Sequence, residues 1–223
     1  MARVYTISQR KKRSPLSGIS VTLILIIINV VAFFLFLFLI SSNIISIDSV
    51  AIKPANILDG KYLWTFVTSM FMHGSFFHIF ANMFSLLFLG SLIEKILGPK
   101  RYFWFYMISG LFAGLFFVLL SLIFTADINT YAVGASGALF GVAGLMMILT
   151  PNLPLYVMFI PIPIKAKYAI PGLLIVLWII SITANVGIGN TAHLGGLIAG
   201  LAYGIYLRKK YSKKTKYISR YFS

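Results

Sequence analysis

The fold of this chain is decided by the stretch GASGALFGVAGLMMILTP, residues 134–151, in which Ser136 begins a short apolar run that ends at Pro151. A second short run has the same form, because His193, in the sequence AHLGG, begins a run that ends at Arg208. At 1.5 Å of rise per residue, Ser136 and His193 each stand roughly 21–23 Å from the far end of their run. A hydrocarbon core is about 30 Å thick. The sequence therefore predicts a hydroxyl and an imidazole at one depth inside a membrane, where water is scarce.

The composition of the chain is typical of a polytopic membrane protein. Hydrophobic residues make up 60% and charged residues 10% of its 223 residues, whereas soluble domains average about 25% charged residues. The chain would therefore have too little polar surface to stay in water as a monomer. It has no cysteine, which excludes disulfides and thiolate zinc sites. Its four acidic residues are Asp48, Asp59, Glu94 and Asp127.

The formal net charge of +15 does not indicate nucleic-acid binding. The Lys and Arg residues flank the apolar runs, where the positive-inside rule places them, and no soluble part exists to carry a reader of nucleic-acid grooves. The first apolar run, Ile19–Ile40, follows the basic cluster Arg10–Arg13 and is too long for the core of a cleaved signal peptide. We expect it to be a transmembrane helix that begins in the cytoplasm.

Hydropathy predicts an all-α bundle of six transmembrane helices with both termini in the cytoplasm. We expect the helices at about 18–42, 77–97, 102–124, 136–149, 168–184 and 191–208. A long connection at 43–76 contains two short amphipathic stretches, and prolines make 150–166 a loop. With this topology, every Lys and Arg except Lys53 and Lys61 falls in a cytoplasmic segment.

Three regions follow from this topology. A basic cytoplasmic segment, 1–17, precedes the membrane domain, 18–208, and a basic tail, 209–223, follows it. We expect the tail to be a solvated anchor near anionic lipid.

Few polar side chains interrupt the predicted helices, and they lie at a similar depth. His78 and Asn82 are four residues apart and share one helix face. His78 stands about 25 Å from the cytoplasmic end of its helix, near the depth of Ser136 and His193. Polar groups inside membrane helices are costly and tend to be functional. Three helices are thus expected to present polar groups at one level.

These four residues fit the roles of nucleophilic catalysis. A serine hydroxyl is a weak nucleophile until a base removes its proton, and histidine is the base suited to neutral pH. A His or Asn side chain and the backbone N–H of Ser136 would donate to a developing oxyanion. Because the acid nearest a span, Glu94, lies at the opposite end, we expect a dyad of Ser136 and His193. Phe140, one turn after Ser136, would stack on the imidazole.

Glycines predict that the fourth and sixth helices lie close together. Gly196, Gly200 and Gly204 form a stripe on the sixth helix, and Gly137, Gly141 and Gly144 line the fourth. Small residues let membrane helices approach closely.

Ordinary alternatives exist for each residue taken alone. A single Ser in a membrane helix usually bonds the carbonyl four residues earlier, a single His or Asn often bonds a neighbouring helix, and glycine stripes often serve packing alone. His73 and His78 do not predict a metal site, because one helix face would not hold both and acids are absent. His73 is expected to be a loop or interface residue, and we expect no metal and no other cofactor.

The chain resembles the rhomboid family of intramembrane serine proteases over roughly residues 60–208. The strings that carry the resemblance are MHGSFFHIFAN at 72–82, GASG at 134–137, and AHLGG at 192–196 followed by Gly200. Each is weak alone, but their order, spacing and helix placement together are specific. The resemblance implies that Ser136 is the nucleophile, His193 the general base, and His78 and Asn82 the side-chain part of the oxyanion hole.

Three further residues bear on the resemblance. Glu94 matches a family glutamate near the end of the second helix, which implies a structural role. The family often has Trp-Arg in the first loop, where this chain has Trp64-Thr65, so the contacts that anchor the loop differ. Many members have Tyr where this chain has Phe140, which preserves ring stacking but removes a hydroxyl. Inactive relatives lack the Ser or the His, and this chain keeps both.

The expected function is that of an endopeptidase that cleaves transmembrane or juxtamembrane segments of membrane-protein substrates. The substrate helix would enter sideways and partly unwind, with the fifth helix, 168–184, or the loop 185–190 as the gate. The alternatives are a non-catalytic rhomboid-like protein that binds transmembrane helices for quality control and, less favoured, a channel or transporter, for which charged or broken helices at the midplane are missing. The Ile- and Lys-rich composition suggests a prokaryotic plasma membrane.

Overall fold

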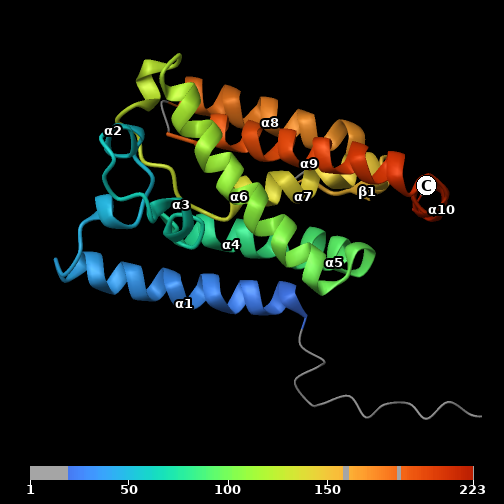
Figure 1. Ribbon diagram of the computed structural model, residues 1–223, viewed down its shortest axis with the longest axis horizontal. Helices are drawn as coiled ribbons and strands as arrows, with labels where there is room; N and C mark the ends of the chain where they lie inside the picture. Colours follow the sequence, from blue (N-terminus) through green and yellow to red (C-terminus); the bar gives the residue numbers. More distant parts are fainter. Residues whose placement is uncertain (1–19, 158–160, 185–186, 223) are drawn as a thin grey trace, which may run out of the picture.

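The structure is a computed structural model that describes residues 20–157, 161–184 and 187–222. Long helices lie alongside one another, and short helices and loops cover one end of the bundle (Figure 1). The predicted segment 1–17 lies outside the described residues. So do the first two residues of the predicted first helix and residues 185–186 of the proposed gate loop.

The described chain is mostly helical. Its elements, in chain order, are α1 (Val21–Ser41), η2 (Ile47–Ser49), α2 (Pro54–Leu58), α3 (Thr65–Thr68), α4 (Phe76–Ser85), η3 (Leu86–Gly90), α5 (Ser91–Leu97), α6 (Pro99–Ser121), η4 (Thr125–Asp127), α7 (Ser136–Leu149), β1 (Pro154–Leu155), β2 (Ile164–Lys165), α8 (Ala166–Thr183), α9 (Asn190–Lys210) and α10 (Ser212–Tyr221). The two strands pair antiparallel inside the predicted loop at 150–166.

The helix bounds agree with the sequence in some places and correct it in others. The helix expected at 136–149 is α7, whereas the helix expected at 102–124 begins at Pro99 and ends at Ser121. Pro99 is suited to a first helical position, because the N–H that proline lacks would have no partner there. The tail expected at 209–223 is also corrected, because α9 continues to Lys210 and α10 follows it.

Among the described residues, four helices are long and apolar enough to span a membrane by length and composition. They are Val21–Ser41, Phe76–Leu97 (α4, η3 and α5 together), Pro99–Ser121 and Ala166–Thr183. The helix Ser136–Leu149 is apolar but shorter, and α9 is not among the four. The chain is thus a helical membrane protein, while the count of six spans and the side of the membrane on which the termini lie stay predictions.

The short helix α7 lies at the centre of the bundle. It contacts α6, α8 and α9, and every residue from Ala138 to Met146 is buried. A helix of 14 residues is shorter than the roughly 20 residues that cross a hydrocarbon core. Because its neighbours cover it, α7 does not have to match the thickness of the lipid by itself.

Glycines bring α7 and α9 into backbone contact. A Cβ atom added at Gly196 would overlap the carbonyl oxygen of Gly137, and one added at Gly200 would overlap the carbonyl oxygen of Gly141. The stripes do not match along their whole length, because Gly204 faces Ile148. Close approach of this kind requires small residues on the facing surfaces, and it lies directly after Ser136 and His193 along their helices.

Glu94 attaches α1 to the bundle. Its carboxylate accepts hydrogen bonds from the backbone N–H of Val21 (2.7 Å), the backbone N–H of Thr22 (2.9 Å) and the Thr22 hydroxyl (2.7 Å). The first N–H groups of a helix have no partner within the helix, and the helix dipole favours a negative charge there. The side chain is therefore fully engaged at the end of the bundle opposite the loops.

The α7–α9 contact predicts that Gly200→Ala destabilises the folded protein. The added methyl group meets backbone atoms, which yield less easily than side chains, and overpacking typically costs about 1–3 kcal/mol. Gly172→Ala in α8 is the matched control, because a Cβ atom there meets nothing within 4 Å. Thermal unfolding in detergent should show a lower midpoint for Gly200→Ala only. Equal midpoints for the two variants would contradict this account of the interface.

Candidate active site

Ser136 and His193 meet between two helices that are far apart in the sequence. Ser136 is the first residue of α7, and His193 lies in the first turn of α9. The imidazole Nε2 is 2.8 Å from the serine Oγ, which is hydrogen-bond distance for an activated hydroxyl. His193 is 7% exposed. The contact therefore lies in a largely enclosed place.

Phe140 fixes the plane of the imidazole. Its ring lies 4.6 Å from the His193 ring, centroid to centroid, with the two planes 21° apart. Phe140 is one turn after Ser136 on α7, so one helix supplies both the hydroxyl and the stacking ring. The imidazole is thus held from one face while its Nε2 points at the serine.

His78 and Asn82 lie beside the loop that leads into α7. A Cβ atom added at Gly134 would come within 2.8 Å of the His78 ring and 3.6 Å of Asn82 Nδ2. Gly134 has a φ of +112° and donates its N–H to the carbonyl of Ser69 (2.8 Å). This backbone conformation and this lack of space both require glycine. The imidazole of His78 and the amide of Asn82 therefore pack against Gly134, which precedes Ser136 by two residues.

One donor of Asn82 is already engaged. Its Nδ2 donates to the carbonyl of His78 at 3.0 Å, one turn earlier on α4. An amide nitrogen carries two hydrogens, so one N–H is left for a further acceptor.

His73 contacts residues of the site, which the sequence did not indicate. It is 4% exposed, and its Nδ1 lies 3.3 Å from the carbonyl oxygen of Phe71. Because a carbonyl only accepts, Nδ1 carries the proton, and Nε2 then accepts from the N–H of Ala135 at 3.5 Å. The ring also packs edge-on against His78, at 5.1 Å between centroids. The expectation of a loop residue holds, but this loop residue supports the backbone next to Ser136.

Two buried atoms in the first turn of α9 have no hydrogen-bond partner among the described residues. They are Nδ1 of His193 and Oδ1 of Asn190. Asn190 is 4% exposed and begins α9, one turn before His193. Residues three apart on a helix are neighbours, about 5–6 Å between Cβ atoms. Sequence reasoning missed Asn190, and its three-residue spacing from His193 is the signal that could have identified it.

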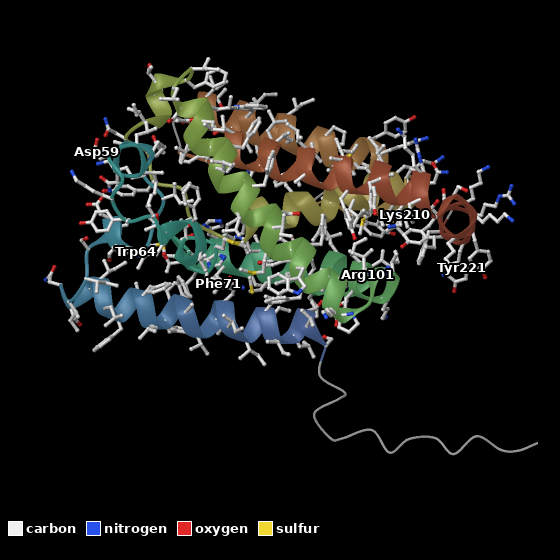
Figure 2. All side chains as sticks on the ribbon, viewed as in Figure 1. Asp59, Trp64, Phe71, Arg101, Lys210 and Tyr221 are labelled. Atoms are coloured by element: carbon white, nitrogen blue, oxygen red, sulfur yellow. The ribbon has the colours of Figure 1, made fainter. Side chains whose placement is uncertain are left out.

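The loop before α4 is anchored without the arginine that the resemblance led us to expect after Trp64. The Trp64 indole donates to the carbonyl of Ser49 at 2.8 Å, and the Thr65 hydroxyl donates to the carbonyl of Tyr62 at 2.7 Å. Thr65 is fully buried. Side-chain bonds to backbone carbonyls therefore hold this loop, and Figure 2 shows Trp64 at the loop end of the bundle.

One residue singled out in the sequence analysis, Glu94, lies away from the site. Glu94 lies near the opposite end of the bundle, where it binds the first turn of α1. Within the described part of the chain, His, Asp and Glu side chains form no group of three that would hold a metal ion.

Comparison with known proteins gives a consistent picture. Residues 60–210 match the family model described as a rhomboid domain. The chain is 37% identical over 159 residues to RHOMBOID-like protein 1 of Arabidopsis thaliana, covering 69% of this chain and 37% of that protein. It is 32% identical over 156 residues to the mitochondrial Rhomboid protein 1 of Saccharomyces cerevisiae, covering 66% of this chain and 43% of that protein.

A further relative is named as inactive. Inactive RHOMBOID-like protein 8 of Arabidopsis thaliana is 33% identical over 142 residues, covering 61% of this chain and 36% of that protein. The match thus spans less than half the length of each of these relatives, and membership of the family does not by itself imply catalysis. The family model nevertheless matches well over half of this chain, together with its helical membrane fold, and the chain belongs to the rhomboid family.

Proposed function

We propose that this protein is an intramembrane serine endopeptidase. The observation that supports this most directly is the 2.8 Å contact between Ser136 Oγ and His193 Nε2. The oxygen of a serine aimed at an imidazole in an enclosed site is the arrangement that acyl transfer requires.

The proposed reaction has two stages. The Ser136 oxygen attacks the carbonyl carbon of a substrate peptide bond while its proton passes to His193 Nε2. The imidazolium then gives that proton to the leaving nitrogen as the C–N bond breaks, which leaves an acyl-enzyme. A water molecule, deprotonated by the same Nε2, hydrolyses the ester and restores the serine.

His78 and Asn82 are the proposed side-chain donors to the oxyanion. Both lie against Gly134, and the backbone N–H of Ser136 begins a helix, where N–H groups have no helical partner. Donors fixed in place before the reaction stabilise the charge as it develops. His73 then has a positioning role, because it contacts the N–H of Ala135 and the ring of His78.

Asn190 is the proposed support for the imidazole. For Nε2 to accept the serine proton, the other ring nitrogen, Nδ1, must carry a hydrogen. Within the described part of the chain, that hydrogen has no acceptor, and Asn190 Oδ1, one turn away, has no donor. A small side-chain rotation or one bridging water molecule would satisfy both atoms. This asparagine would take the place that a carboxylate occupies in a triad.

The proposed substrates are transmembrane or juxtamembrane segments of membrane proteins. A helical backbone has its carbonyls already hydrogen-bonded, so the segment must unwind locally before attack. Small or helix-breaking residues near the cleaved bond would lower that cost. Lateral entry at the helix predicted at 168–184 or at the loop 185–190 stays the proposal for how the segment reaches the site. The matched relatives include a mitochondrial protein and plant proteins, so they give no support to a prokaryotic plasma membrane, which stays a prediction from composition.

Ser136→Ala and His193→Ala should each lower cleavage of a transmembrane substrate by at least about 10³-fold, because the two residues act as one unit. Ser109→Ala is a matched control, since Ser109 is a buried serine of a neighbouring helix whose hydroxyl, unlike that of Ser136, has no partner in the described chain. The assay uses purified full-length protein in detergent, with labelling of Ser136 by a fluorophosphonate probe as a second readout.

The outcomes of this test separate two explanations. Cleavage that persists in either variant would reject the dyad. A folded wild-type protein that neither cleaves nor reacts with the probe would favour the non-catalytic alternative, a protein that only binds transmembrane helices.

His78→Ala and Asn82→Ala should each lower kcat by about 10²–10³-fold with a smaller change in KM, because oxyanion donors act mainly in the transition state. Phe80→Ala provides the control on the same helix, since its side chain is 64% exposed and faces away from the site. A rise in KM alone, with kcat unchanged, would assign the two residues to substrate binding instead.

Asn190→Ala should lower kcat roughly tenfold at unchanged KM and slow probe labelling in proportion, because the imidazole loses the acceptor that orients it. Asn190→Asp keeps an acceptor oxygen and should retain more activity. Thr191→Ala is the control for loss of a neighbouring buried polar group, whose partner is Asp127 (3.2 Å). Equal effects of the Asn190→Ala and Thr191→Ala variants would show that Asn190 is structural only.

A further inference from the structure

The two ends of the bundle differ sharply in charge. Figure 2 shows Arg101, Lys210 and Tyr221 at one end and Asp59 and Trp64 at the other. Of the four acids of the chain, Asp48 and Asp127 lie with Asp59 in or beside the loops, where Asp48 binds Asn56 and Asp127 binds Thr191. The basic end is therefore short of acidic partners.

Glu94 does not compensate the basic end. Its carboxylate is already bound by three donors at the start of α1. The ion pair found among the described residues is Lys61–Asp59, which lies at the loop end. The Lys and Arg side chains of α10 and of the neighbouring helix ends consequently need counter-ions from outside the chain.

A recess of about 140 Å³ opens among these basic residues, between α10 and the ends of four other helices. Its volume exceeds the roughly 30 Å³ that a water molecule occupies in the liquid. Arg101 and Lys214, both exposed, lie at its edge. Its apolar lining comes from α5, α7 and α9 and consists of Ile96, Leu97, Leu149 and Leu207. The recess thus has two cationic side chains at its edge and an apolar lining below them.

The helix α10 has two distinct faces. Thr215, 6% exposed, points toward the bundle, and Ile218 lines the recess. Lys213 and Lys216 are exposed on the other side. In Figure 2 this helix is seen nearly end-on, so it runs across the end of the bundle. A basic amphipathic helix with this orientation typically lies in the plane of a membrane surface.

We propose that the recess binds one anionic glycerophospholipid from the adjacent leaflet. The phosphate lies between Arg101 and Lys214, since a guanidinium and an ammonium both donate to phosphate oxygens. The start of an acyl chain covers the apolar floor, which a free phosphate ion would leave exposed. The lipid ties α10 to α6, two elements that no ion pair joins in the described chain. This site is separate from the Ser136–His193 site and does not depend on proteolysis.

The test measures lipid binding to the purified full-length protein by native mass spectrometry. Phosphatidylglycerol is titrated against phosphatidylcholine with the same acyl chains. The test variant is Arg101→Gln with Lys214→Gln. The matched control is Lys209→Gln with Lys216→Gln, which removes the same charge from exposed lysines that do not line the recess.

We expect the wild type and the control to prefer phosphatidylglycerol by tenfold or more. The test variant should lose affinity for it about 25-fold, since a basic residue near an anionic surface contributes about fivefold, or about 1 kcal/mol. Unchanged unfolding midpoints would show that all three proteins are folded.

Three results would overturn the proposal. Equal losses in the two double variants would mean diffuse surface charge in place of a site. No preference for phosphatidylglycerol in the wild type would remove the anionic requirement. Displacement of the lipid by inorganic phosphate or glycerol phosphate at matching concentration would mean that the recess binds a free anion.

Discussion

The close contact between α7 and α9 is the constraint on which the rest of the structure depends. Gly196 and Gly200 place their Cα atoms against the carbonyls of Gly137 and Gly141, so the two helices meet backbone to backbone. Side chains as short as a serine and an imidazole then reach each other across the interface. With ordinary side chains the helix axes would stand 8–10 Å apart, and the hydroxyl and the imidazole would be separated.

The remaining elements complete or support this pair. The helix α4 brings His78 and Asn82 to Gly134, whose positive φ turns the chain into α7. His73 accepts from the backbone beside Ser136 and packs on His78. At the far end, Glu94 secures α1 and leaves the surrounding cations without an internal partner. The bundle thus separates a polar, enclosed site near its loops from a basic surface suited to lipid phosphate.

Much of this organisation was predictable from residue order. Apolar runs bounded by Pro, Gly and basic residues located the helices, and the start of α7 at Ser136 was predicted to the residue. The start of α6 was missed because Gly98-Pro99 ends one helix and begins the next without an intervening loop. The helix α10 was missed because its residues are mostly basic or polar, and the segment was interpreted as a solvated tail.

The sequence by itself determined the helical membrane character of the chain and the approximate helices, because hydropathy and rise per residue are local properties. The common membrane depth of Ser136 and His193 stays a prediction from those same properties. It also identified Phe140, His78 and Asn82 as residues near that depth. Only the tertiary structure decided that Nε2 reaches Oγ and that His73 supports the Ala135 backbone. It also decided that buried atoms of Asn190 and His193 lack partners among the described residues, and that Arg101 and Lys214 line one recess. Such contacts join residues tens of positions apart or depend on side-chain orientation, which helix packing fixes and local patterns do not.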